Sequence, residues 1–202
     1  SECSGIRIFG RRIKSLAFST DVAIIKNINA DAIIAVYPFT PQPVISQAII
    51  SVSEVPVFVG VGGGMTNGDR SVRLAEFSEH QGASGVVVNA PISNETIAKM
   101  KAVVDIPVVT TIVSGDMDIA GRLAAGADIL NVSGASRTPE IVTKIRAEFP
   151  TVPIIATGGP REEDILRTIE AGANAITYTP PTTGQLFADI MISHRKNFSH
   201  QD

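Results

Sequence analysis

The chain has 202 residues, of which 44% are hydrophobic, 18% are charged and 5% are aromatic, and its formal net charge at pH 7 is −3. This composition suits one folded domain and excludes a disordered chain, while the lack of a basic stripe argues against a nucleic-acid partner. No apolar run reaches the ~18 residues of a membrane span and no signal peptide precedes the fold, so we expect no membrane contact and a cytoplasmic location. The only cysteine, Cys3, cannot form an internal disulfide.

The predicted elements alternate between strand and helix along the chain. Residues Gly5–Lys14 predict a short hairpin or an irregular lid. Eight strands are then expected at Ser15–Thr20, Ala32–Tyr37, Pro56–Val61, Gly85–Asn89, Val108–Val113, Ile129–Ser133, Pro153–Thr157 and Ala175–Thr179. Helices are expected at Asp21–Asn29, in a segment ending near Ser53, and at Asp69–Gln81, Asn94–Val104, Asp118–Ala125, Pro139–Phe149, Glu162–Ala171 and Thr183–Lys196.

The strands are continuous apolar runs, which is typical of a parallel sheet that is buried on both faces. Strict alternation with helices, at about 25 residues per unit, predicts a single (β/α)8 TIM barrel over residues 1–202. Two repeated marks precede the strands. The first comprises Val55-Pro56-Val57, Ile106-Pro107-Val108 and Val152-Pro153-Ile154, and the second comprises Asn29-Ala30-Asp31, Gly82-Ala83-Ser84, Gly126-Ala127-Asp128 and Gly172-Ala173-Asn174. We interpret both as marks of the bottom of the barrel.

The candidate site therefore lies at the opposite strand ends, where such barrels carry their chemistry. Asp21, Asn89 and Asn131 are the catalytic candidates, with Asp21 as the acid or base. The substrate-binding candidates are Tyr37, Gly62, Gly63, Thr111, Ser133, Thr157, Tyr178 and Thr179. For each group a purely structural role stays open: a helix N-cap for Asp21, barrel packing for the small polar residues and rim packing for the tyrosines.

A glycine-rich corner after the seventh strand predicts an anion site. In Thr157-Gly158-Gly159-Pro160, the two glycines would let backbone N–H groups approach a phosphate closely. Thr183 and Gly184, at the start of the last helix, are the other predicted phosphate donors. The alternative is a tight turn that needs glycine for its backbone conformation.

Other chemistries lack their residues. No lysine stands at a predicted strand end to form a Schiff base. The three histidines, His80, His194 and His200, fall on helices or in the tail, so we predict no metal site.

Several motifs resemble the second half of known phosphate-binding barrels. They are Gly126–Ser133, Pro153–Pro160, the helix end Glu170-Ala171-Gly172-Ala173, and Asn174–Thr179. Similar motifs occur in 2-keto-3-deoxy-6-phosphogluconate aldolases, thiamine-phosphate synthases, and the flavin-dependent nitronate-oxidase and inosine-monophosphate-dehydrogenase barrels. As a whole the chain resembles a bacterial β/α-barrel family that is often labelled hydrolase. The resemblance implies phosphate at Gly158 and Gly159, but the aldolase lysine is unmatched, since Asn131 and Ser133 follow the sixth strand.

Three functions follow as hypotheses. The first is a hydrolase, lyase or isomerase that acts on a small phosphorylated or anionic metabolite without a cofactor. The second is an oxidoreductase that binds flavin mononucleotide (FMN), and the third is a non-catalytic barrel that binds a metabolite. A homo-oligomer is compatible with each, because barrels often dimerise.

Overall fold

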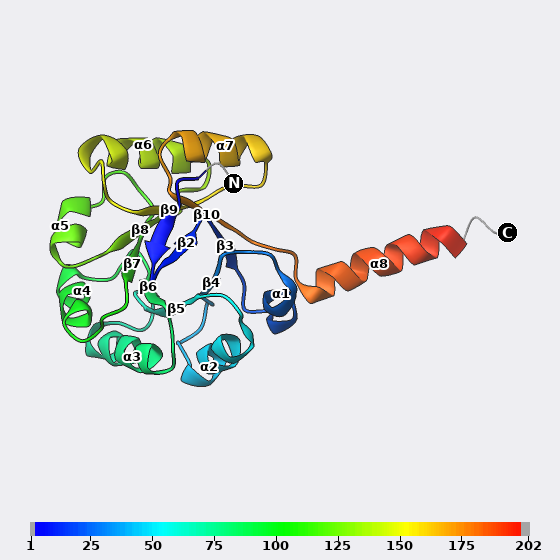
Figure 1. Cartoon of the computed structure of the whole chain (residues 1–202), viewed down its shortest axis with the longest axis horizontal. Helices are drawn as coiled ribbons and strands as arrows, with labels where there is room; N and C mark the ends of the chain where they lie inside the picture. The colour runs from blue at the N-terminus through cyan, green and yellow to red at the C-terminus, as the bar shows by residue number, and fades with distance from the viewer. Residues whose placement is uncertain (1–2, 199–202) are drawn as a thin grey trace.

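The computed structural model describes residues 3–198 (Figure 1). A two-stranded antiparallel hairpin, β1 (Ile6–Ile8) and β2 (Arg11–Ile13), precedes a closed barrel in the order β10-β3-β4-β5-β6-β7-β8-β9. The barrel strands are β3 (Ser15–Phe18), β4 (Ala32–Ala35), β5 (Val57–Gly62), β6 (Gly85–Val88), β7 (Val108–Ile112), β8 (Ile129–Val132), β9 (Ile154–Thr157) and β10 (Ala175–Tyr178). The helices are α1 (Val22–Asn27), α2 (Pro43–Val52), α3 (Gly68–His80), α4 (Asn94–Lys101), α5 (Ile119–Ala124), α6 (Thr138–Glu148), α7 (Glu162–Glu170) and α8 (Thr183–Phe198), with a 3-10 turn, η1, at Ala135–Arg137.

The predicted (β/α)8 TIM barrel is confirmed, because every neighbouring pair of barrel strands is parallel. Side chains alternate between the lumen and the helices. On β4, Ile33 and Ala35 pack in the cluster beneath the helices, whereas Ala32 and Ile34 join the lumen cluster. Burial of both faces explains why the strands have continuous apolar sequences.

The repeated marks lie at the bottom, as predicted. The carbonyls of Pro56, Pro107 and Pro153 each accept a hydrogen bond from a residue of the preceding strand, and β5, β7 and β9 begin one residue after these prolines. A proline is tolerated at a strand's first position because it lacks only the N–H group.

The N-terminal hairpin also lies at the bottom. Its turn contains Phe9 and Gly10, both with positive φ, as tight hairpin turns require. Ile6, Ile8 and Ile13 are buried in the lumen cluster. Of the two predicted alternatives, the segment is therefore the regular hairpin and not an irregular lid, and it closes the lower end of the barrel.

The last helix departs from the expected barrel. α8 forms over the predicted residues, but it projects away from the ring of α1–α7 (Figure 1). Every residue from Gly184 to Lys196 is exposed. Within residues 3–198, the barrel is thus covered by seven helices, and the position between α7 and α1 has no helix of its own. No helix of this described part is both long and apolar enough to cross a membrane.

Candidate functional site

Three polar side chains form an arc on neighbouring strands at the barrel mouth. Val88 pairs with Thr110 and Thr111 pairs with Asn131, which places Asn89, Thr111 and Asn131 at one level. They point inward, because the residues two positions earlier, Val87, Val109 and Ile129, lie in the lumen cluster. The Nδ2 of Asn131 donates to Oγ1 of Thr111 at 3.5 Å. We call Asn89, Thr111 and Asn131 the amide arc.

A second arc of hydroxyl groups continues around the mouth. Val132 pairs with Ala156 and Thr157 pairs with Thr177, so Ser133, Thr157 and Thr177 share the next level on β8, β9 and β10. Thr177 is only 6% exposed. Its Oγ1 has no hydrogen-bond partner within the described protein. We call Ser133, Thr157 and Thr177 the hydroxyl arc.

Thr177 was missed by the sequence analysis, although a signal was available. Asn131 stands four residues after the repeat alanine Ala127, and Thr177 stands four residues after the equivalent Ala173. The same offset therefore identifies both as inward-facing. Thr179, which was predicted instead, lies beyond the end of β10 and is exposed.

A cavity of about 180 Å³ opens beside Asn89. It is lined by the loop after β4, the glycine-rich loop after β5, and the ends of β5 and β6. Of the predicted glycines, Gly62 lines this cavity, whereas Gly63 packs against the backbone of Asn89. A Cβ on Gly63 would lie 2.6 Å from the backbone nitrogen of Asn89, and one on Gly62 would lie 2.1 Å from Oγ of Ser71. Both glycines also have positive φ.

The two predicted tyrosines lie in different places, Tyr37 at the cavity and Tyr178 away from the mouth. Tyr37 lines the cavity, but its hydroxyl accepts from the Gln42 nitrogen at 2.8 Å and donates to the Gln42 carbonyl at 3.3 Å. Tyr178 alternates with the inward Thr177 and packs instead in the outer cluster with Ala17 and Ile25. Burial, with a smaller effect of Asp31, raises the pKa of Tyr178. Its prediction as a mouth residue is wrong.

Asp21 is a structural anchor rather than a proton-transfer group. Its Oδ1 accepts hydrogen bonds from the backbone nitrogens of Ala23 and Ile24, which caps α1. Both oxygens also bind Thr183: Oδ2 accepts from its nitrogen at 2.9 Å and Oδ1 from its Oγ1 at 3.0 Å. The bonds to Thr183, followed by those to α1, hold the pKa of Asp21 below its ordinary value. A carboxylate that accepts four hydrogen bonds is a poor base, so the N-cap alternative describes Asp21.

Two of the four predicted phosphate donors, Gly158 and Thr183, already form hydrogen bonds within the protein. The nitrogen of Gly158 donates to the Thr177 carbonyl at 3.1 Å, and Thr183 donates to Asp21. Asp164 packs beneath Gly159, where a Cβ would meet that of Asp164 at 2.9 Å. Three acidic residues also occupy the first turn of α7. Acidic side chains there repel an anion, so the prediction of phosphate at Gly158, Gly159, Thr183 and Gly184 is not supported.

The same engagement weakens the FMN hypothesis, which needs this loop for the flavin phosphate. The described residues also contain no group of three or more His, Cys, Asp or Glu that could hold a metal ion. The described side chains at the mouth are therefore amide and hydroxyl groups, which are hydrogen-bond donors and acceptors.

No protein-family model matches the chain, and no curated protein matches it in sequence. Solved structures with the same fold include a provisionally assigned phosphonomutase from Burkholderia cenocepacia J2315, with a TM-score of 0.68 and 16% identity over 97% of this chain and 95% of that one. A phosphonopyruvate hydrolase in complex with oxalate and Mg²⁺ has a TM-score of 0.66 and 15% identity over 94% and 82%. A 2,3-dimethylmalate lyase of the PEP mutase/isocitrate lyase superfamily has a TM-score of 0.66 and 14% identity over 93% and 81%.

These likenesses support the TIM barrel. They do not confirm the phosphate-binding families that the sequence motifs resemble. At such identities they establish the fold alone, and the activity has to be argued from the mouth.

Proposed function

We propose that this chain is a barrel enzyme of the lyase or hydrolase kind, and that its substrate is a small metabolite bearing carbonyl or carboxylate oxygens. The observation that carries the proposal is the position of the Asn89 side chain. Asn89 belongs to the amide arc and lines the cavity, and its exposed side-chain amide forms no hydrogen bond among the described residues. Unpaired amide N–H groups at a cavity wall are suited to bind an oxygen acceptor.

The size of the cavity limits the substrate. At about 180 Å³ it is smaller than the roughly 300–1,000 Å³ of pockets for drug-sized ligands, so it suits a molecule with few heavy atoms. The hydrolase neighbour was solved with oxalate, a small dicarboxylate. Its Mg²⁺ has no equivalent ligand set in the described part of this chain.

The arcs suit the stabilisation of negative charge. Amide and hydroxyl donors that are fixed by a rigid barrel can stabilise an oxygen on which charge develops during bond cleavage. Asn89 would bind the reacting oxygen, Asn131 is held by Thr111, and the Thr177 hydroxyl lies one level further. Each such donor contributes about 10²–10³-fold to the rate in known enzymes.

The test is a turnover screen of small 2-oxo and hydroxy carboxylates, followed by mass spectrometry. With an active substrate in hand, Asn89→Ala should lower kcat/KM by about 10²-fold or more. Asn27→Ala is the matched control, because Asn27 lies on α1 and donates only to the Ala23 carbonyl. Equal rates for both variants would contradict the assigned site.

One observation favours a second function, a non-catalytic metabolite-binding barrel. The two arcs contain no carboxylate, imidazole or amine that could transfer a proton. Calorimetric titration with oxalate separates the two functions: binding that Asn89→Ala abolishes, without turnover of any compound in the screen, would establish the binding barrel.

A further inference from the structure

The ring of helices and the projecting helix are complementary. A (β/α)8 barrel buries the outer face of each strand under a helix, yet the place between α7 and α1 is left open in the single chain. α8 is the helix that follows β10, and every residue from Gly184 to Lys196 is exposed. Each copy of the chain thus has one helix without a surface to cover and one surface without its helix.

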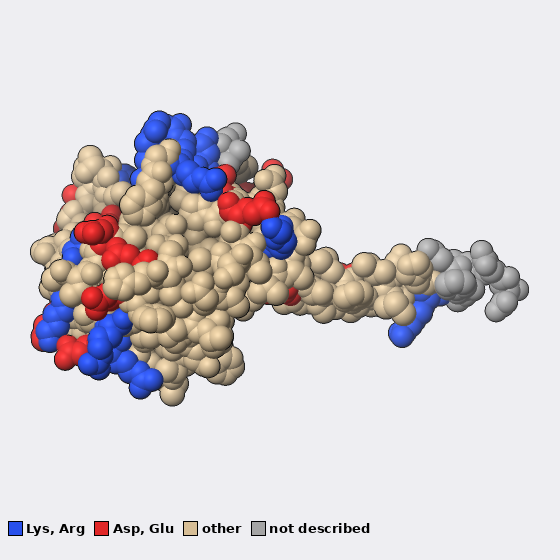
Figure 2. Space-filling view, turned by 60° about the horizontal axis from the view of Figure 1, so that its bottom comes forward, with Lys and Arg blue, Asp and Glu red and all other residues tan. Residues whose placement is uncertain are grey.

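The side chains of α8 are those of a buried helix. Leu186, Phe187, Ile190 and Met191 recur at the spacing of one helix face, and Phe187 is 64% exposed. Figure 2 shows α8 almost free of charged atoms until the basic group near its far end. Most of the stability of a helix in a protein comes from packing of its apolar face, so this face calls for a surface to cover it.

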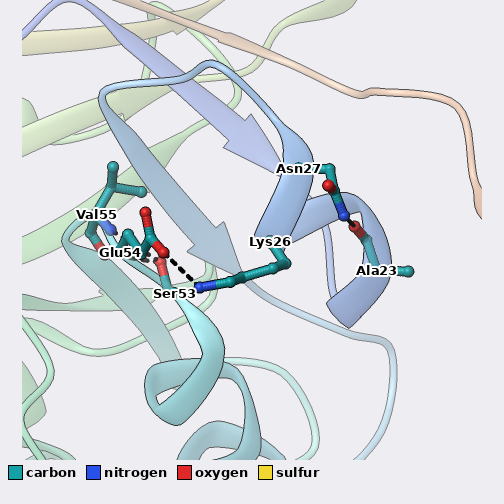
Figure 3. Close-up of polar contacts among 6 residues, drawn as sticks. All are labelled: Ala23, Lys26, Asn27, Ser53, Glu54 and Val55. Atoms are coloured by element: carbon teal, nitrogen blue, oxygen red, sulfur yellow. Dashed lines mark hydrogen bonds and ion pairs between the residues drawn. The ribbon is translucent and has the colours of Figure 1, made fainter.

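The open position presents an apolar wall from α1. Ile25 of α1 packs in the core, and the next residue, Lys26, reaches Glu54 beyond the end of α2 (Figure 3). The side of α1 that follows Ile25 therefore faces α2. Ile24 lies about 100° to the other side of Ile25, so it faces the open position and is only partly buried.

The second wall comes from α7 by the same rule. All barrel helices run in the same direction, so the residue after a core-facing residue points to the next place in the ring. On α7 the core-facing residue is Ile165 and the next is Leu166, which is 39% exposed. Leu166 therefore faces the open position from the side opposite to Ile24.

The chain cannot easily place its own α8 there. Asp21 at the start of α1 binds both the nitrogen and the hydroxyl of Thr183, the first residue of α8. No residues remain between this anchor and the helix to reverse its direction, and Pro180 and Pro181 restrict the connection before it. The anchor thus directs α8 outward.

We propose that two copies of this chain exchange α8, each helix packing between α7 and α1 of the other copy. Reciprocal exchange covers both helices and both open positions at once, and a two-fold pair is closed to further addition. With 16 residues, α8 is roughly 24 Å long, which is enough to run along the side of a barrel. The proposal concerns assembly and stands independently of the proposed function.

The first test is the mass of the full chain in solution by light scattering. The wild type and the control Val44→Glu, an exposed residue of α2, should have the mass of two chains. Phe187→Glu and Leu166→Glu should each have the mass of one chain, with an unchanged circular dichroism spectrum of the barrel. A wild type with the mass of one chain, or two variants that remain paired, would overturn the exchange.

A mixture of the two variants distinguishes exchange of α8 between chains from packing of α8 against its own barrel. A chain with Phe187→Glu keeps a normal open position, and a chain with Leu166→Glu keeps a normal α8. Only in a mixed pair can a normal α8 pack into a normal open position. An equimolar mixture should therefore recover paired mass that neither variant shows alone, and absence of recovery would contradict the exchange. Should Leu166→Glu not fold, Phe187→Glu decides by its mass, because its side chain is exposed in the single chain.

Discussion

Thr177→Val should make the protein more stable. The Thr177 hydroxyl is buried in the lumen and has no hydrogen-bond partner within the described protein. A buried hydroxyl without a partner costs about 1–3 kcal/mol, and valine replaces it with a methyl group of the same shape. We expect a gain near the lower limit, about 1 kcal/mol, which in a domain of this size raises Tm by roughly 2–4 °C.

Thr110 supplies a matched control for this prediction. Its Oγ1 is equally buried without a partner, but Thr110 alternates with the inward Thr111 and so faces the helices. Both valine variants should melt at higher temperature in calorimetry. Only Thr177→Val should weaken binding of a carboxylate ligand, because only that hydroxyl belongs to the mouth. A drop in Tm for Thr177→Val would refute the reasoning, since it would show that the hydroxyl has a bound partner such as water.

Three further predictions concern the scaffold. Asp21→Ala should cost about 1 kcal/mol through the lost helix cap. Because folding lowers the pKa of Asp21, the difference from wild type in chemical unfolding should be full near neutral pH and disappear as the pH falls through and below the ordinary carboxyl pKa of 3.8. Arg146→Met should cost about 3 kcal/mol, since Arg146 donates to four carbonyls and a side-chain amide at the barrel bottom, whereas Arg161→Met, in an exposed ion pair, should leave the melting temperature unchanged. Gly63→Ala should destabilise the protein more than Gly10→Ala. A Cβ at position 10 meets no atom within 4 Å, so Gly10→Ala costs only the roughly 1–2 kcal/mol of placing alanine in a left-handed backbone conformation. Equal melting temperatures for the two glycine variants would contradict the close approach to Asn89.

The barrel could be predicted because short sequence patterns determine each of its strands. Apolar runs bounded by Val/Ile-Pro and Gly-Ala marks specify strands buried on both faces. The marks also show which strand ends form the mouth, where Asn89, Thr111 and Asn131 are neighbours. The two arcs follow from the register of the strands, because side chains along a strand point alternately to the lumen and to the helices.

The remaining site could not be predicted because it depends on contacts between distant residues. Asp21 and Thr183 are 162 residues apart, so their hydrogen bonds, which remove a base and a phosphate donor together, leave no local pattern. The hydrogen bond from the Gly158 nitrogen to the Thr177 carbonyl joins two strands and could not be predicted for the same reason. The residues that form α8 were predicted from the sequence, but its projection away from the ring of helices was not.

The closure of the barrel has a consequence for folding. The Asn174 amide donates to Ser4 across 170 residues, and Asp21 accepts from Thr183 across 162. β10 therefore has to be present before β3 and β9 are both paired, and β10 is the last of the described strands in chain order. A chain that is interrupted before residue 175 would leave two unpaired apolar edges, which are sites for aggregation. Translation must therefore pass β10 before the native topology of the barrel can form.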